Sequence, residues 1–437
     1  MGSPTMPNDA IAPSSSAAPR VNALLEKAWS KGWLSRPVLE PDALIGAARA
    51  RTGLQDLGAE PGWRERLELL LHALHEEAAL TPLGKVIAYG QLVAALANRA
   101  RAHTLWQRHP EILDIPIPAP IVVLGQMRSG STRMQRLLAC DPRLAHTRFF
   151  ESWNPLPGAR LGRIDDRMLR GWIGLRCAHW LNPEFGIIHP TGTCQPDEEI
   201  GLHNVSIFGS AFEAQWRVPS FAAAGEAMDA VPVYTEFKRL LQSIAWLRGE
   251  RGDRPWILKV PQLTQDLGAL LEVFPDARLV CLDRPAAALV ASSASLVHSQ
   301  MRMQSDAVDR DWIGREWLRK IALRQRRMRA ARARADVPQV DVDFDTMNAD
   351  WAGEMQRVYR ALGMALTPAV EQRMARYMAQ PAHRKLGGHR YTLEAFGLSR
   401  QEVDAAMVAA PSSDRLRLVP SAIEHKAEPA QTRIRAG

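Results

Sequence analysis

Residues 121–132 read IVVLGQMRSGST, and this stretch decides the fold of the chain. Four apolar residues, three of them β-branched, predict a buried parallel strand from Ile121 to Leu124. Residues Gly125 to Gly130 predict a tight loop, and Ser131 begins an amphipathic run at helical spacing. Strand, loop and helix N-terminus together predict an anion-binding cradle, because loop N–H groups converge there and the helix dipole favours negative charge.

The position of the positive charge distinguishes this loop from an ATP-binding loop. The spacing of Gly125 and Gly130 matches a nucleotide P-loop, but Ser131 stands where a Walker A sequence requires lysine. The cation lies inside the loop instead, at Arg128. This displacement favours a phosphate-ester donor other than ATP. An apolar segment that ends in Asp283 is nevertheless typical of a Walker B strand, so a P-loop kinase or NTPase is the alternative.

Two further predicted strands end in polar residues. Residues 256–261, WILKVP, place Lys259 at a strand end just before a proline. Residues 277–284, ARLVCLDR, end in Arg284, and Ser292 follows eight residues later on a predicted helix. An arginine fork with a helix hydroxyl suits a phosphate dianion. Because ligands of α/β sheets lie at the carboxyl ends of the strands, we expect the three segments to form one site.

Together the three elements resemble PAPS-dependent sulfotransferases, where PAPS is 3′-phosphoadenylyl sulfate. The loop Gly-x-x-Arg-Ser-Gly-Ser-Thr is most similar to protein-tyrosine sulfotransferases and bacterial sulfotransferase-family proteins, and the order of elements agrees over about residues 115–300. The resemblance implies transfer of a sulfonate group from PAPS to a hydroxyl acceptor, with release of PAP. It implies that Arg284 and Ser292 hold the 3′-phosphate. The groups implied for the 5′-phosphosulfate are those of the loop: Arg128, Ser129, Gly130, Ser131 and Thr132.

The reaction requires a general base within hydrogen-bond reach of the acceptor hydroxyl. Tyrosine sulfotransferases use a glutamate at a similar distance past the loop arginine, so the resemblance assigns this role to Glu151. Small-molecule sulfotransferases use a histidine, which makes His189 the alternative. Arg128 and Lys259 are expected to neutralise charge on the bridging oxygen and the leaving phosphate, and no metal is then required. A scaffold that binds PAPS or another nucleotide without catalysis is a further alternative.

Two polar segments outside these elements also carry alternatives. Residues Asp197 to Glu199 either recognise acceptor hydroxyls or begin a helix with favourable acidic charges, and we prefer the helix. Residues 383–391 are basic and contain glycine, and they resemble a late loop that closes over the 3′-phosphate in sulfotransferases. An exposed basic turn is the alternative. The cofactor-binding residues implied in this loop are Lys385, His389 and Arg390.

Length and composition predict a globular α/β enzyme. The chain has 437 residues, of which 46% are hydrophobic, and this is enough for a large core. A net charge of +8 and a pI of about 9.6 suit nucleic-acid binding, but no nucleic-acid motif is present. The basic residues concentrate in residues 310–334, where apolar residues at helical spacing predict a long helix with one buried face. We therefore expect no nucleic-acid partner, and the resemblance implies a small-molecule or peptidyl hydroxyl acceptor.

The chain divides into four predicted parts. Residues 1–20 are rich in Ser, Ala and Pro and are predicted to be disordered, and residues 21–112 form a helical N-terminal layer. Residues 113–424 form a P-loop-type α/β domain with a parallel sheet flanked by helices. A mostly helical insertion at about 150–250 is expected to supply an acceptor pocket or lid, and residues 425–437 form a flexible tail.

The sequence also gives expectations about location. It contains no signal-peptide pattern and no apolar run of 18 residues, so no membrane span is expected. Four cysteines are scattered without metal or disulfide spacing. These features predict a cytoplasmic protein, and they leave the oligomeric state open.

Overall fold

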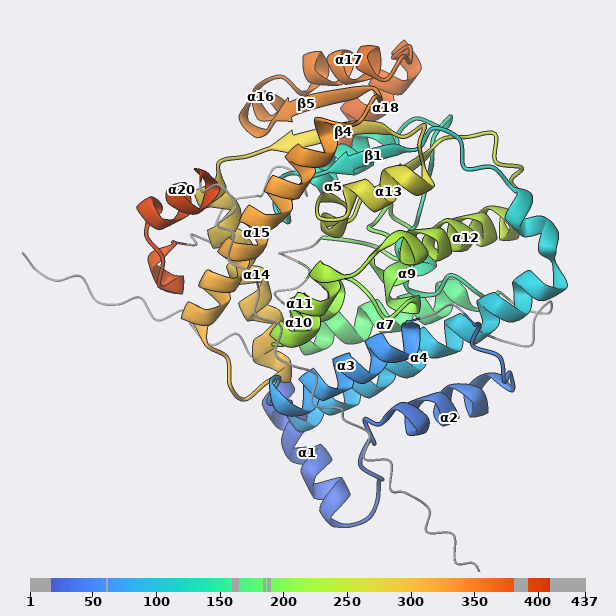
Figure 1. Ribbon diagram of the computed structural model, residues 1–437, viewed down its shortest axis with the longest axis vertical. Helices are drawn as coiled ribbons and strands as arrows, with labels where there is room; N and C mark the ends of the chain where they lie inside the picture. Colours follow the sequence, from blue (N-terminus) through green and yellow to red (C-terminus); the bar gives the residue numbers. More distant parts are fainter. Residues whose placement is uncertain are drawn as a thin grey trace, which may run out of the picture.

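The computed structural model describes residues 17–408 apart from 60–61, 159–164, 184–185, 187–189 and 381–391. Within these residues a five-stranded sheet has the order β2-β3-β1-β4-β5, and every paired strand is parallel (Figure 1). The strands are β1 Ile121–Leu124, β2 Ala145–His146, β3 Trp256–Leu258, β4 Arg278–Asp283 and β5 Gln339–Asp343. The predicted α/β fold with a parallel sheet is thus confirmed. The two-residue edge strand β2 was not predicted.

The strand order explains where a ligand can bind. Strand β1 lies between β3 and β4, with Val122 paired to Leu258 on one side and to Leu279 on the other. The chain therefore runs to one side of β1 first and to the other side later. Such a reversal separates the loops that leave neighbouring strand ends and forms a crevice at the carboxyl end of the sheet. The loop after β1 stands at that crevice.

Helices surround the sheet on both faces. Before the sheet lie α1 Ala18–Ser30, α2 Pro41–Thr52, α3 Trp63–Glu76, α4 Pro82–Arg108 and the short helix η1 Pro110–Asp114. Between β1 and β3 lie α5 Ser131–Leu138, α6 Phe149–Trp153, α7 Arg167–Leu181, α9 Ile200–Val205, α10 Ser210–Gln215, α11 Pro219–Ala227 and α12 Val231–Leu247. Between β3 and β5 lie η2 Pro261–Thr264, α13 Leu267–Val273, α14 Ala286–Gln304 and α15 Arg310–Arg332. After β5 come α16 Phe344–Ala349, α17 Trp351–Ala361, α18 Pro368–Met378, η3 Glu394–Phe396 and α20 Arg400–Val408.

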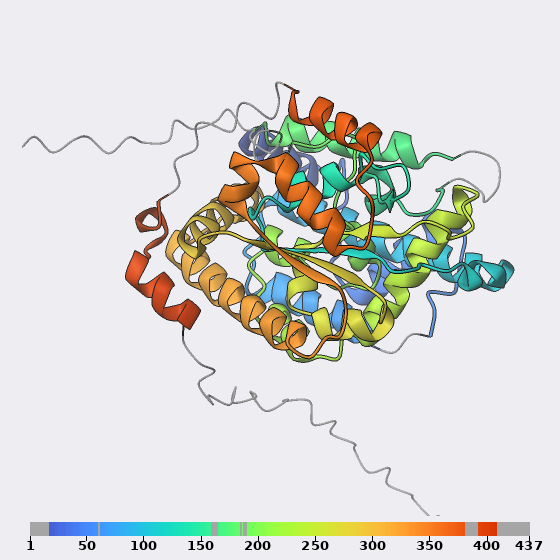
Figure 2. The ribbon, with the colours of Figure 1, turned by 90° about the horizontal axis from the view of Figure 1, so that it is seen from above.

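The sheet is buried on both faces, as its continuous apolar strands require. Val122 and Leu124 pack in one core cluster with residues of α12 and α13, whereas Val123 packs in another with residues of α5, α17 and α18. Figure 2 shows α17 and α18 on the opposite side of the sheet from α13 and α15. Helix α15 is the predicted long basic helix, and its predicted apolar face is buried. The buried residues of that face are Ile313, Trp317, Ile321 and Met328.

Helices α1 to α4 lie at the end of the molecule opposite the sheet (Figure 1). They are joined to the rest by a buried ion pair, in which Arg99 of α4 lies 2.7 Å from Glu236 of α12. Helix α1 begins at Ala18, so the prediction of disorder was wrong for residues 18–20. The reason is that Pro19 occupies the first turn of α1, where the missing proline N–H costs no hydrogen bond. None of the described helices is long and apolar enough to cross a membrane.

Candidate functional site

The loop after β1 has the backbone of an anion cradle. Arg128 and Gly130 both have positive φ, 69° and 89°, and the N–H of Ser129 donates to the carbonyl of Gln126 at 3.1 Å. A Cβ at Gly125 would lie 2.3 Å from Ser129 Oγ, so a larger residue there would displace the Ser129 side chain. Helix α5 follows directly, and no described side chain caps its N-terminus. The first N–H groups of α5 are thus left for a ligand at the positive end of the helix dipole.

Two side chains of the loop have buried polar atoms that lack partners. Gln126 and Ser129 are 4% and 2% exposed. The amide nitrogen and oxygen of Gln126 and the hydroxyl of Ser129 accept and donate no hydrogen bond within the described residues. Burying such groups without a partner destabilises a fold. The loop therefore fits a ligand with several hydrogen-bonding oxygens.

Arg128, Arg284 and Ser292 are brought together as the sequence predicted. Arg128 Nε donates to Ser292 Oγ at 3.1 Å, and Nη1 of Arg284 donates to the carbonyl oxygen of Arg128. The neighbouring Ser293 donates to the carbonyl oxygen of Met127 at 3.3 Å. The loop after β1 is thus fastened to the end of β4 and to helix α14. Arg284 and Ser292, which lie eight residues apart, both form a hydrogen bond with Arg128.

The two arginines form a region of concentrated positive charge. Burial lowers the pKa of Arg284, and the like charge of Arg128 lowers it further. The Arg284 guanidinium lies 4.2 Å from the centre of the Phe344 ring, which directly follows β5. Sequence reasoning missed Phe344, although its place at a strand end was the available signal. A bound polyanion stabilises two neighbouring cations of this kind.

Lys259 completes the site from the end of β3. Its side chain is 1% exposed and its Nζ donates to Thr132 Oγ1 at 3.1 Å, so Lys259 lies at the first turn of α5. The same Nζ forms an ion pair with Glu198. The backbone N–H of Lys259 donates to Glu199 Oε2 at 2.7 Å. Two adjacent glutamates therefore hold Lys259, one through its side chain and one through its backbone.

These contacts add a second role to the acidic run, whose predicted place at the start of a helix is confirmed. Residues Asp197 to Glu199 directly precede α9, but no side chain in the described structure caps that helix. Instead, Glu198 and Glu199 contact Lys259, and Asp197 accepts a hydrogen bond from Thr191 at 2.5 Å. Burial raises the pKa of Glu199 to about 8. The contact was missed because Glu198 and Lys259 lie 61 positions apart, across an insertion whose path no local pattern determines.

Glu151 lies in a different environment. Its carboxylate accepts from the backbone N–H of Arg148 at 2.9 Å and from Arg248 Nε at 2.9 Å, and Arg248 Nη2 binds its other oxygen. The residue is 1% exposed. These are the contacts of a helix cap and an ion pair, and none of them supports the predicted role as base. The alternative base His189 lies outside the described residues, as do Lys385, His389 and Arg390.

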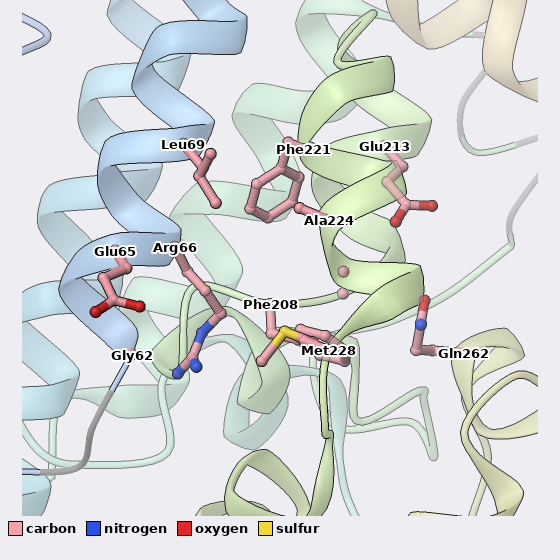
Figure 3. A pocket seen from close by; sticks show the side chains of 12 residues that line it. Gly62, Glu65, Arg66, Leu69, Phe208, Glu213, Phe221, Ala224, Met228 and Gln262 are labelled. Carbon is pink, nitrogen blue, oxygen red and sulfur yellow. The ribbon is translucent and has the colours of Figure 1, made fainter. Parts of the chain in front are cut away.

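The insertion between β1 and β3 lines a cavity of about 160 Å³. Figure 3 shows Leu69 of α3 and Phe221 of α11 facing each other across it, with Phe208 and Met228 below them. Gln262 also lines the cavity, three positions after Lys259. The lining is mostly apolar, as in pockets that bind small organic molecules.

Comparison with known proteins decides between the functions that this geometry allows. Residues 120–368, more than half of the chain, match the profile of the sulfotransferase family. The chain belongs to the sulfotransferase family. The structure of this sulfotransferase is similar to sulfotransferase STF1 from Mycobacterium tuberculosis H37Rv, with a TM-score of 0.74 and 28% identity, covering 85% of this chain and 99% of that one. It is also similar to sulfotransferase STF9 from Mycobacterium avium, with a TM-score of 0.74, 25% identity, and coverage of 84% and 95%. No curated protein matches the sequence.

The family assignment confirms the predicted activity. The sulfotransferase transfers a sulfonate group to a hydroxyl acceptor, and the alternative of a P-loop kinase or NTPase is overturned. The closer resemblance to the tyrosine sulfotransferases stays a prediction. No group of three His, Cys, Asp or Glu residues that could hold a metal ion occurs in the part of the chain that the structure describes.

Proposed function

We propose that this sulfotransferase takes its sulfonate group from PAPS, with the donor lying across the carboxyl ends of β1, β3 and β4. The observation that carries the proposal is the junction of Arg128, Arg284 and Ser292, which joins two strand ends into one cationic surface. A donor with phosphate groups at both its 5′ and 3′ positions needs such a surface, since each phosphate requires its own charge-assisted hydrogen bonds.

Each end of the donor has a matching set of groups. The 5′-phosphosulfate is assigned to loop residues 128–132 and the N-terminus of α5, where Gln126 and Ser129 have buried polar atoms without partners among the described residues. The 3′-phosphate is assigned to Arg284 and Ser292. The alternative in which the protein only binds a nucleotide shares these contacts and differs only in turnover.

The donor supplies an activated sulfonate group, and the protein supplies charge. Lys259 lies at the first turn of α5 through its contact with Thr132, and Arg128 lies within the loop. Both can neutralise the negative charge that grows on the bridging oxygen and the leaving phosphate. Fixed charges in a site that excludes water are worth more than in bulk solvent, and they need no reorganisation during the reaction.

The acceptor is proposed to be a small-molecule or peptidyl hydroxyl, and the cavity between α3 and α11 is proposed to hold its apolar part. The cavity is lined largely by the insertion at about 150–250, where an acceptor pocket was predicted, and it reaches η2 through Gln262. The predicted cytoplasmic location stays a prediction.

Ligand-induced stabilisation tests the donor assignment. PAP should raise the melting temperature of the protein, because a ligand that binds only the folded state stabilises it by mass action. ATP with Mg²⁺ at the same concentration should have a smaller effect, since it has no 3′-phosphate. A preference for ATP with Mg²⁺ would contradict the proposal. Incubation with labelled PAPS and a panel of alcohols, phenols, sugars and tyrosine peptides then separates an enzyme from a nucleotide-binding scaffold and identifies the acceptor.

A further inference from the structure

The Glu198 carboxylate is in direct contact with Lys259, one of the cations at the proposed reaction site. Its ion pair with Lys259 Nζ adjoins the hydrogen bond from that nitrogen to Thr132 Oγ1, so Glu198 lies beside the first turn of α5. The Glu198 side chain is 16% exposed, whereas that of Lys259 is 1% exposed. Glu198 is thus the member of the pair that a second substrate can approach.

The neighbours of Glu198 fix its backbone on both sides. The N–H of Asp197 donates to the carbonyl of Thr147 at 3.0 Å, and Asp197 Oδ1 accepts from the N–H of Glu198 at 2.9 Å. Glu199 binds the backbone N–H of Lys259 at 2.7 Å. These contacts fix the backbone at Glu198 next to the end of β3. They do not depend on the side chain of Glu198.

The other carboxylates near the site are poor proton acceptors. Glu199 is fully buried, and burial raises its pKa to about 8, so it is largely protonated at neutral pH. Asp197 is 3% exposed and accepts from Thr191. Glu151 is 1% exposed and is held by Arg248. Among the described carboxylates of the site, Glu198 alone combines partial exposure with contact to Lys259.

We propose that Glu198 is the general base of the transfer, an inference that rests on the proposed function. Glu198 takes the proton of the acceptor hydroxyl while the hydroxyl oxygen forms a bond to sulfur. The bond from sulfur to the 5′-phosphate oxygen breaks, and its electron pair stays on that oxygen, which Lys259 and Arg128 stabilise. Glu198 then releases the proton to solvent. Donor binding brings negative charge to Lys259 and loosens its pair with Glu198, which frees the carboxylate for the acceptor.

The substitution Glu198→Gln distinguishes a role as base from a merely structural role. A base predicts equal or tighter PAP binding together with lower turnover. Glutamine keeps the size of the side chain but does not compete with the donor for Lys259. Affinity for PAP, measured by calorimetry, should therefore stay equal or become up to about tenfold tighter. Turnover of labelled PAPS with the acceptor from the panel should fall by about 100-fold or more, since general base catalysis contributes at least that much. Hydrolysis of PAPS in buffer gives a second turnover measurement that needs no acceptor.

A matched control and a conservative variant make the result decisive. Glu354→Gln removes a glutamate of similar exposure, 11%, that pairs with Arg357, and it should change neither PAP affinity nor turnover. Glu198→Asp should recover part of the activity lost in Glu198→Gln. Near wild-type turnover in Glu198→Gln, or weaker PAP binding that accounts for its lost turnover, would overturn the inference. Failure of the wild-type protein to bind PAP would instead overturn the proposed function.

Discussion

Arg128 Nε donates a hydrogen bond to Ser292 Oγ at 3.1 Å, although the two residues lie 164 positions apart. This bond, with the contact from Arg284 to the Arg128 carbonyl, makes one structural unit of the loop after β1 and the start of α14. The groups assigned to the two ends of the donor are therefore connected by hydrogen bonds. A change at Arg284 is expected to disturb the loop as well as the 3′-phosphate.

Removal of the Arg284 side chain is expected to weaken donor binding strongly. Arg284→Ala deletes the fork assigned to the 3′-phosphate and the hydrogen bond to the Arg128 carbonyl. PAP affinity should fall by about 2 to 4 kcal/mol, as expected for a lost contact between an arginine and a phosphate dianion. Calorimetric titration measures the change. Arg36→Ala, which removes an exposed arginine paired with Glu26, serves as the control and should leave PAP affinity unchanged. Unaltered affinity in Arg284→Ala would mean that the 3′-phosphate binds elsewhere.

Loss of the Glu151 carboxylate is expected to affect stability more than chemistry. Glu151→Gln removes the nearer of the two carboxylates that pair with Arg248, which is 12% exposed, and leaves only Glu250 at 3.5 Å. Removing one member of a buried pair typically costs roughly 3 kcal/mol or more, and the remaining contact with Glu250 reduces that cost, so the melting temperature should drop by a measurable amount. Turnover per folded molecule should change by less than about tenfold, because base catalysis would cost at least 100-fold. A normal melting temperature together with a 100-fold loss of turnover would support the base role implied by the resemblance.

The strand ends of the site were predictable from sequence because their signals are local. An apolar run of four residues followed by a glycine loop specifies β1 and the start of α5 without reference to the rest of the chain. The same holds for Lys259 after β3 and for Arg284 after β4. Since parallel strands all place their carboxyl ends at one edge, the order of the motifs was enough to bring these residues together.

The carboxylates were not predictable in this way. Glu151 follows the loop at the distance seen in related enzymes, yet its contacts are determined by Arg248, which directly follows α12 and lies 97 positions later. Glu198 reaches Lys259 across 61 positions. Both contacts depend on how the insertion between β1 and β3 folds back on the sheet, and helical periodicity does not encode that path.

Filling the cavity between α3 and α11 is expected to impair acceptor binding selectively. Ala224 lines the cavity, so Ala224→Leu places three additional carbon atoms in it. The KM for the acceptor should rise about tenfold, whereas PAP affinity should not change, because the donor groups lie at the strand ends. Ala223→Leu adds the same volume one position earlier on α11, outside the cavity lining, and is the matched control. Equal KM values in the two variants would place the acceptor elsewhere.

The pH dependence of stability is expected to report the protonation of Glu199. Burial raises the pKa of this carboxyl from 4.5 to about 8. Between these values the unfolded chain releases the proton while the folded protein keeps it, so the free energy of unfolding falls as pH rises. The slope from one such group is at most about 1.4 kcal/mol per pH unit.

Other buried groups with shifted pKa values change the stability mainly at lower pH. The effect of Glu199 can therefore be measured in a pH range above them. Burial lowers the pKa of His146 to about 4 and of His203 to about 3, and these residues increase stability as pH rises towards 6.5. Asp266, with its pKa raised by burial to about 6, acts in the opposite direction in that same lower range. Between pH 6.5 and 8, Glu199 is therefore expected to contribute most of the pH dependence of stability that these four residues cause.

Glu199→Gln keeps an oxygen for the N–H of Lys259 but cannot ionise. Its free energy of unfolding, measured by urea denaturation, should fall less steeply with pH over this window than that of the wild type. Parallel slopes for the two proteins would show that Glu199 is already ionised in the folded state.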